Sequence, residues 1–353
     1  VMVTGLWQAV SGASSSWLMH SWTVTGVAVA TTIVLTLLLM RKAAGGGVWV
    51  NVGKVVVFAV LIAGGCWALT RASAADVASS LRPFFSAGFA GLIQAMGYTF
   101  IALQGFDLIA AVGGEVRNPE RTLPRAMVLA LCIALAIYLP LLFLIVTVGT
   151  PADQSIDEVA EANPEAIVAI AAQFYLGPFG YWLVIVAAIL SMLSALLANL
   201  FAASRIARAM ARDRTLPALL ARLSAKYHTP YTAVLATSVI VIVILLVLPD
   251  VAAAGAASSL IFLVTFAIAH GVAVLVRQRD PQHPPPFRAP LFPVVPIVGG
   301  VACVALAVFQ GVAIPEAGLI TAIWLCVGGI LFLSLFAHRA RLRDASSAAL
   351  DPH

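Results

Sequence analysis

The chain has 353 residues, of which 62% are hydrophobic and only 10% are charged, and its net charge is +5. An ordinary soluble domain has about 25% charged residues. This composition excludes an ordinary soluble protein and indicates one that is embedded in a lipid bilayer.

Apolar stretches recur along the whole chain, and each is long enough as an α-helix to cross a hydrocarbon core of about 30 Å. We predict nine spans, at residues 23–40, 48–69, 88–113, 126–149, 178–203, 231–249, 255–276, 293–313 and 316–337. The runs are continuous, whereas the strands of a membrane β-barrel would alternate apolar and polar residues. The sequence therefore predicts a single all-α, polytopic membrane domain over residues 1–338. Residues 339–353 are predicted to form a cytoplasmic tail, which is disordered from residue 340.

Basic residues are distributed unevenly between the two sides of these spans. The connections after the first, third, fifth, seventh and ninth spans contain 17 of the 20 Lys and Arg residues. Because basic residues collect on the cytoplasmic side of a membrane, these connections and the C-terminus are predicted to be cytoplasmic. The acidic segment 150–166, TPADQSIDEVAEANPEA, is then external. The positive net charge is thus explained by the orientation of the protein in the membrane and by contact of basic residues with lipid headgroups. Nucleic-acid binding is not predicted.

The four cysteines, Cys66, Cys132, Cys303 and Cys326, all fall inside predicted spans and form no CxxC pair. They are interpreted as small core residues, and neither a disulfide framework nor a metal site is indicated. The sequence contains no HExxH or GxSxG motif, which makes a membrane-embedded enzyme the less favoured class. We predict no cofactor.

Two charged residues fall inside predicted spans, where a charge is costly unless it faces a cavity or a partner. Lys54 lies in the second span and could extend its ammonium group to the lipid headgroups, or could face the interior as a bound cation or proton carrier. Asp107 lies in the third span, in IALQGFDLIAAVGGE, after Gln104 and Gly105. This stretch predicts either a helix interrupted inside the membrane, whose backbone lines a cavity, or close helix packing through glycines.

The fifth span contains the polar residues Ser191, Ser194 and Asn199 among apolar ones, and Ser204 directly follows it. Hydroxyls in membrane helices commonly bond to the carbonyl four residues earlier, so these side chains are either structural or ligands.

Three stretches resemble motifs of one family, in the same order. FIALQGFDLIAAVGGEVRNPERTLPRAM (100–127) resembles the sixth-helix signature of the amino acid-polyamine-organocation (APC) superfamily of amino acid permeases. SRIARAMARDRTLPALLARLSAKYHTP (204–230) resembles the pattern after the eighth helix, and NVGKVVVFAVL (51–61) resembles the fifth helix with its lysine. The resemblance implies a LeuT-like inverted-repeat transporter fold, in which helices one and six are broken and face the substrate.

On this resemblance the nine spans are helices four to twelve of twelve. The first residues then read as the end of an earlier helix, and we expect the sequence to be N-terminally truncated. The interrupted stretch would be Ile101, Ala102, Leu103, Gln104 and Gly105, whose carbonyl groups would bind the substrate amino group. Lys54 would be a coupling residue in a proton-coupled transporter, with Ser191, Ser194, Asn199 or Ser204 as neighbours. Asp107 would stabilise the broken helix.

The function implied is secondary active transport of an amino acid or a related amine across the plasma membrane. Alternating access around the broken sixth helix would be coupled to protons or would be exchange. A second hypothesis is an inactive fragment or an assembly partner of a transporter, because half of the family's binding site would be missing.

Overall fold

The computed structural model describes residues 21–41, 48–82, 87–150, 156–164, 166–247, 251–279, 287 and 289–348. All regular elements within these ranges are helices. Eight of the helices in the described part are long and apolar enough to cross a membrane. The prediction of an all-α, polytopic membrane protein is therefore confirmed. The interpretation of the first residues as the end of a helix falls at 1–20, outside the described residues.

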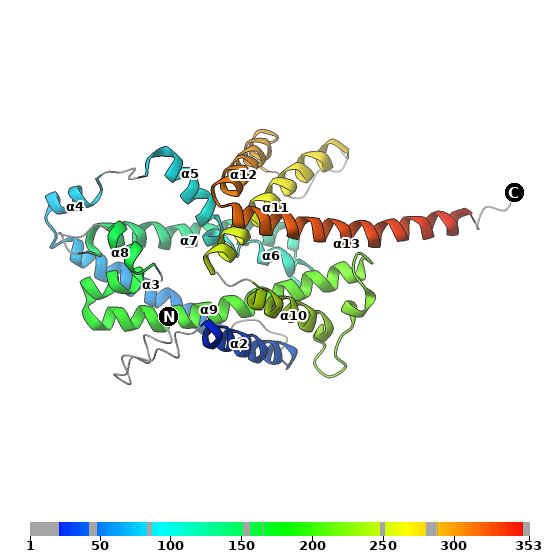
Figure 1. Cartoon of the computed structure of the whole chain (residues 1–353), viewed down its shortest axis with the longest axis horizontal. Helices are drawn as coiled ribbons and strands as arrows, with labels where there is room; N and C mark the ends of the chain where they lie inside the picture. The colour runs from blue at the N-terminus through cyan, green and yellow to red at the C-terminus, as the bar shows by residue number, and fades with distance from the viewer. Residues whose placement is uncertain are drawn as a thin grey trace. The chain divides into compact units, whose positions relative to one another are not determined.

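The longer helices follow the predicted spans in chain order (Figure 1). They are α2 (Ser21–Arg41), α3 (Val48–Leu69), α5 (Gly88–Thr99), α7 (Pro119–Val148), α9 (Ile167–Arg212), α10 (Tyr231–Val247), α11 (Val251–Arg279), α12 (Val294–Ala313) and α13 (Pro315–Ala348). Helix α10 coincides with the sixth predicted span, but its 17 residues make it shorter than the eight candidate spans. The total of nine spans stays a prediction.

Shorter elements lie between these helices. They are α4 (Ala74–Ser80), η1 (Phe100–Leu103), α6 (Leu108–Ala111), η2 (Gly113–Glu115), α8 (Ile156–Ala162) and η3 (Ala218–Ala221). Ser73 is the N-cap of helix α4, and its hydroxyl accepts hydrogen bonds from the amides of Ala75 and Asp76. Helix α8 has Asp157 and Glu158 in its first turn, where negatively charged carboxylates interact favourably with the positive end of the helix dipole.

One predicted boundary coincides with a kink. The fifth span was predicted to start at residue 178, and α9 consists of two helical segments that meet at Gly177, where φ is 66° and ψ is −161°. Pro178 directly follows the kink, at the start of the second segment, where the missing N–H of a proline costs no helical hydrogen bond. The predicted disorder from residue 340 differs from the structure, because α13 continues to Ala348. Residues 349–353 of the predicted tail lie outside the described residues.

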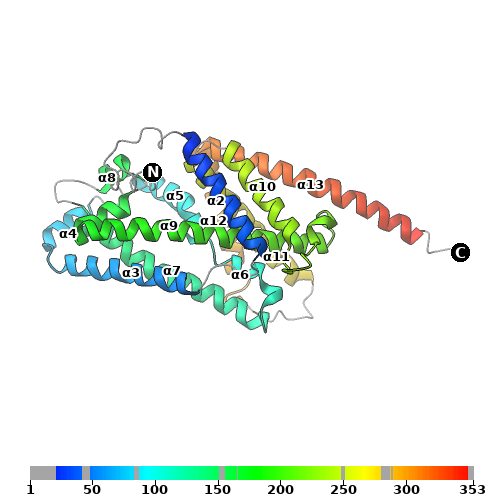
Figure 2. The same cartoon turned by 90° about the horizontal axis from the view of Figure 1, so that it is seen from below.

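The chain divides into two compact units. The first unit comprises Val1–Ser86, Val128–Ala203 and Ser224–Leu246. Its largest core lies where α3, α7 and α9 run side by side (Figures 1 and 2). Here Leu61 of α3 packs with Leu141, Ile145 and Ala172. The glycines at 64 and 65 of α3 face leucines of α9 and α7, so the helices approach closely.

Helices α2 and α10 also lie side by side in this unit (Figure 2). Leu35 and Leu39 of α2 pack with Val234 of α10 and with Leu200 of α9. A polar contact joins the same pair of helices, because the Thr36 hydroxyl lies 2.7 Å from the Ser238 hydroxyl.

The second unit comprises Ala87–Met127, Ser204–Leu223 and Val247–His353. In this unit α5 and η1 pack against α11, and α5 also packs against α12. Buried alanines at 256, 257 and 317 bring α11 and α13 together. Other large apolar side chains in this unit stay exposed, for example Val301 of α12 and Leu333 of α13. Such exposed apolar surface is expected of helices that face lipid, because lipid chains replace water around them.

Candidate functional site

The α-helix that starts at Gly88 is interrupted within a single apolar span. Helix α5 ends at Thr99, residues Phe100–Leu103 form a tighter 3₁₀ turn, and Gln104 is extended with φ −63° and ψ 146°. Gly105 has φ 129°, and helix α6 starts only at Leu108. The interruption therefore includes the stretch 101–105 that the family resemblance implies. Backbone groups in this segment leave the α-helical hydrogen-bond pattern, and the carbonyl groups of Ile101 and Gly105 accept from the amides three residues later instead.

The interruption begins where a serine from another helix enters the hydrogen-bond ladder. In an α-helix the amide of Ile101 would donate to the carbonyl of Gly97, four residues earlier. Here the Ile101 amide donates to the Ser259 Oγ over 3.1 Å, and that hydroxyl donates to the Gly97 carbonyl over 2.8 Å. Ser259 is on α11 and is fully buried. The hydroxyl therefore occupies the place of the missing helical bond.

Gly105 and Asp107 form the other end of the interruption. A φ of 129° is open to glycine but strained for residues with a side chain. The Gly105 amide donates a hydrogen bond to Asp107 Oδ1 over 2.9 Å. The carboxylate thus accepts from a backbone donor that the interrupted helix does not use. This bond explains how a carboxylate is accommodated inside an apolar span.

Aromatic side chains fix both sides of the interruption to one ring on α11. Phe100 and Phe106 each lie with their ring centroids 5.8 Å from that of Phe266. The first pair is edge-to-face, at 76° between the ring planes. Phe262, one turn earlier on α11, lies 6.4 Å from Phe266. One face of α11 therefore contacts the interruption before and after Gly105.

A buried glutamine completes this packing. Gln310 of α12 is fully buried, and its Nε2 donates to the Ala256 carbonyl over 3.1 Å. Its Oε1 would lie 3.0 Å from a Cβ atom placed at Gly97. Only glycine fits at position 97 without a shift of this amide, so α5 and α12 approach closely just before the interruption. The sequence reasoning missed both Ser259 and Gln310, and a polar residue inside an apolar span was the available signal.

The five predicted substrate-binding residues all lie in this interrupted segment. Ile101, Leu103, Gln104 and Gly105 are half-buried, whereas Ala102 is exposed. The Gln104 amide donates to the Ile101 carbonyl over 3.0 Å, which closes the 3₁₀ turn. The structure brings these residues together with Asp107, and their roles stay predictions.

The predicted coupling residues lie on two other helices. Lys54 is half-buried on α3, one turn before Val57 and Phe58, which pack against the core of α3, α7 and α9. Ser191, Ser194 and Asn199 are half-buried on α9, and Ser204 further along α9 is fully buried. Asn199 Nδ2 donates to the Ala195 carbonyl over 3.0 Å, a bond within its own helix. A coupling site formed by Lys54 and these side chains stays a prediction.

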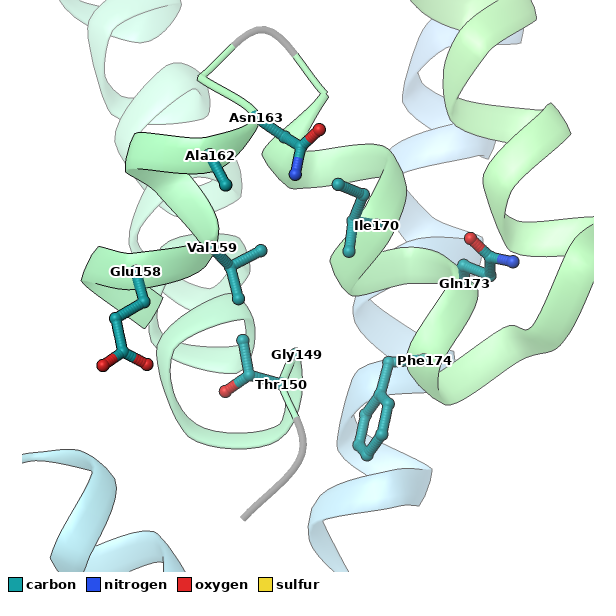
Figure 3. A pocket seen from close by; sticks show the side chains of 9 residues that line it. All are labelled: Gly149, Thr150, Glu158, Val159, Ala162, Asn163, Ile170, Gln173 and Phe174. Atoms are coloured by element: carbon teal, nitrogen blue, oxygen red, sulfur yellow. The ribbon is translucent and has the colours of Figure 1, made fainter. Parts of the chain in front are cut away.

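A separate pocket of about 690 Å³ lies at the end predicted to be external. Figure 3 shows its lining, which comes from the two residues after α7, from α8 and the residue after it, and from the first turns of α9. The polar lining residues are Thr150, Glu158, Asn163 and Gln173. Among the described residues, no group of three or more His, Cys, Asp or Glu side chains could hold a metal ion.

Comparison with known proteins places the chain in a family. Residues 1–336 match the family described as amino acid permease. An uncharacterised transporter of Mycobacterium tuberculosis is 32% identical over 289 residues, which cover 82% of this chain and 62% of the relative. The methylthioribose transporter of Bacillus subtilis is 27% identical over 221 residues, or 63% of this chain and 46% of the relative. The branched-chain amino acid permease BcaP of the same organism is 25% identical over 265 residues, or 74% and 54%.

A set of apolar spans with one span interrupted at a glycine defines a polytopic helical membrane protein. With the match over residues 1–336, the chain belongs to the amino acid permease family. This result confirms the resemblance to the APC superfamily. The chain spans less than two thirds of the length of each of these three relatives.

Proposed function

We propose that the protein carries out secondary active transport of an amino acid or a related amine, by alternating access around the interrupted segment between α5 and α6. The observation that carries this proposal is the broken backbone at Gln104 and Gly105 inside an apolar span. Irregular backbone inside a membrane is tolerated where it lines a cavity or is buried in protein, and transporters use it to bind substrates near the middle of the bilayer. Membership of the permease family supports the same function.

The substrate amino group is proposed to bind backbone carbonyls of Ile101, Ala102, Leu103, Gln104 and Gly105. An ammonium group is a donor of three hydrogen bonds, which suits a cluster of carbonyl acceptors. Side chains of Ile101, Leu103 and Gln104 would then shape the pocket for the rest of the substrate. Asp107 is proposed to stabilise the broken end, and its hydrogen bond with the Gly105 amide supports this role.

Proton coupling is proposed in preference to sodium coupling. The Lys54 ammonium group would repel a second cation at the same place. Its half-buried position on α3, near the start of a span, supports a residue that faces protein rather than water. The protein is proposed to lie in the plasma membrane with its C-terminus in the cytoplasm, as the distribution of Lys and Arg residues favours.

Uptake into proteoliposomes tests this proposal. The product of the complete reading frame would be reconstituted and offered radiolabelled amino acids, simple amines and methylthioribose, with and without an inward proton gradient. Branched-chain amino acids and methylthioribose belong in the panel because relatives carry those names. We expect accumulation of at least one amino acid or amine, enhanced by the gradient. If no amino acid or amine accumulates under either condition, the transport proposal is wrong and the inactive or assembly role is favoured.

A further inference from the structure

We propose that Ser259 is a positioning residue that sets where the transport helix breaks, by inserting its hydroxyl between the Gly97 carbonyl and the Ile101 amide. The geometric part of this proposal stands on the hydrogen bonds alone. Its consequence for substrate binding rests on the proposed function. The proposal assigns a role to α11, a helix outside the interrupted segment.

Local sequence does not explain why the α-helix ends at Thr99. Residues 88–103 contain no proline, and most of their side chains are apolar. The change to a 3₁₀ turn occurs at Phe100, before the chain reaches Gly105 and Asp107. Those two residues therefore account for the second half of the interruption and not for its start. The Ser259 hydroxyl is the group that meets the ladder at the start, with bonds of 3.1 Å and 2.8 Å.

The neighbouring serine shows that this arrangement is specific to one position. The Ser258 hydroxyl donates to the Ala254 carbonyl over 2.8 Å, the usual bond of a hydroxyl within its own helix. Ser259, one residue later on α11, points to α5 instead and is fully buried. Because its donor and its acceptor are both used by backbone groups of another helix, its loss would leave the Gly97 carbonyl and the Ile101 amide without this partner.

The same face of α11 contacts the other side of the interruption. Ser259 and Phe266 are two helical turns apart and therefore share a face. Phe266 packs on both Phe100 and Phe106, at centroid distances of 5.8 Å. Helix α11 thus contacts the segment at its start through a hydroxyl and on both sides of Gly105 through a ring. Through these contacts α11 holds the segment Ile101–Gly105 in its non-α-helical conformation.

Removal of the hydroxyl should let the helix close. In Ser259→Ala the Ile101 amide and the Gly97 carbonyl can satisfy each other directly, which restores the ordinary i to i−4 bond. The α-helix would then extend by about one turn into the proposed binding segment. The carbonyl groups of that segment would turn into the helical ladder, and the apparent KM for substrate should rise about tenfold, as expected for the loss of about one well-placed hydrogen bond.

Amide hydrogen exchange without substrate is the direct test. Peptides covering residues 97–107 would be compared in the reconstituted wild-type protein, in Ser259→Ala, in Ser259→Thr and in the matched control Ser258→Ala. We expect slower exchange in Ser259→Ala only, with Ser259→Thr close to wild type because it keeps the hydroxyl. Unchanged or faster exchange in Ser259→Ala, or an equal change in Ser258→Ala, would overturn the proposal.

Two further measurements keep the test decisive. If Ser259→Ala cannot be purified, Ser259→Cys leaves no cavity, because the thiol is slightly larger than the hydroxyl, and it weakens both bonds. It should show the same change at smaller amplitude, and no change would again overturn the proposal. Uptake kinetics would show a raised KM with a smaller change in maximal rate in Ser259→Ala, restored in Ser259→Thr. A protein that transports nothing on the panel would disprove the proposed function, while hydrogen exchange would still decide the role of Ser259.

Discussion

At the scale of single residues, Gly105 is the position where the interruption depends most on the absence of a side chain. Its φ of 129° lies in a region that other residues enter at a cost of about 1–3 kcal/mol. A Cβ atom at this position would meet no other atom within 4 Å, so the constraint is conformational and not steric. A loss of stability on substitution of Gly105 would therefore report backbone strain and not steric crowding.

We predict that Gly105→Ala lowers both the thermal stability of the purified protein and its rate of substrate uptake. The matched control is Gly26→Ala, in α2, where a Cβ atom also meets nothing within 4 Å and φ is ordinary. Alanine is favoured over glycine in a helix by about 1 kcal/mol, so this control should be neutral or stabilising. Thermal unfolding in detergent would measure both. Equal stability of the two variants would contradict a strained Gly105.

Gly97 and Gln310 are predicted to be energetically coupled. Gly97→Ala should push the Gln310 amide by several tenths of an ångström and weaken its bond to the Ala256 carbonyl. We expect Gly97→Ala to be destabilising by about 1–3 kcal/mol, the usual range for overpacking. In a double-mutant cycle, Gly97→Ala should lower the stability less in a Gln310→Ala background than in the wild type. The shorter side chain at position 310 leaves room for the methyl group added at position 97. Additive changes in unfolding temperature would show that the two positions do not interact.

Gly105 and Asp107 could be singled out from the sequence because their types alone are unusual inside an apolar span, and their roles stay predictions. Ser259 could not be singled out in this way, since Ser258 and Ser259 are identical in type and adjacent. Ser258 donates a hydrogen bond within its own helix, whereas Ser259 donates one to α5. The rotation of α11 about its axis relative to α5 determines which serine makes which bond. That rotation is a property of tertiary packing, and no local pattern specifies it.

At the scale of elements, the end of α2 is held by a threonine from a distant loop. The Thr229 hydroxyl donates to the Met40 carbonyl over 2.9 Å, and Thr229 is almost fully buried. The carbonyl groups in the last turn of a helix lack helical partners, so this side chain caps α2. Thr229 belongs to the Thr-Pro pair at the end of the second family motif, and the structure gives that pair a physical role.

We predict that Thr229→Val destabilises the protein by about 1–3 kcal/mol, because the Met40 carbonyl would lose its partner in a buried place. Thr229→Ser should retain most of the stability. Thr237→Val is the matched control, since the Thr237 hydroxyl bonds only to carbonyls of its own helix, at Ala233 and Val234. Unfolding temperatures of the three variants would be compared. A loss in Thr237→Val as large as that in Thr229→Val would argue against the cap.

The apolar runs predicted that the long helices exist, whereas they did not predict several of the helix ends. The Gly177-Pro178 pair is a common signal for a turn, and it marks the bend in α9. The prediction placed a span start there and missed the helical turns that precede it. The short helices α4 and α8 were missed because tertiary packing and capping, rather than periodicity, support helices of seven residues.

At the scale of the whole molecule, orientation is the property that the sequence specifies most simply. The asymmetry of Lys and Arg predicts that the C-terminus and the connection at residues 204–230 are cytoplasmic, and that residues 150–166 are external. A green fluorescent protein fused after the last residue should fluoresce in bacterial cells, whereas alkaline phosphatase at the same place should be inactive. Alkaline phosphatase inserted near residue 153 should be active. The reverse pattern would invert the proposed topology.

The interruption at Ile101–Gly105 is proposed to bind the transported substrate. Its most direct test is substrate protection of Leu103→Cys, in a background where Cys66, Cys132, Cys303 and Cys326 are replaced by serine or alanine. Leu129→Cys, on an exposed part of α7, is the control. We predict that a membrane-permeant thiol reagent abolishes uptake by Leu103→Cys and that substrate slows this inactivation, with no substrate effect on labelling of Leu129→Cys. Inactivation of Leu103→Cys at the same rate with and without saturating substrate would show that this segment does not bind the substrate.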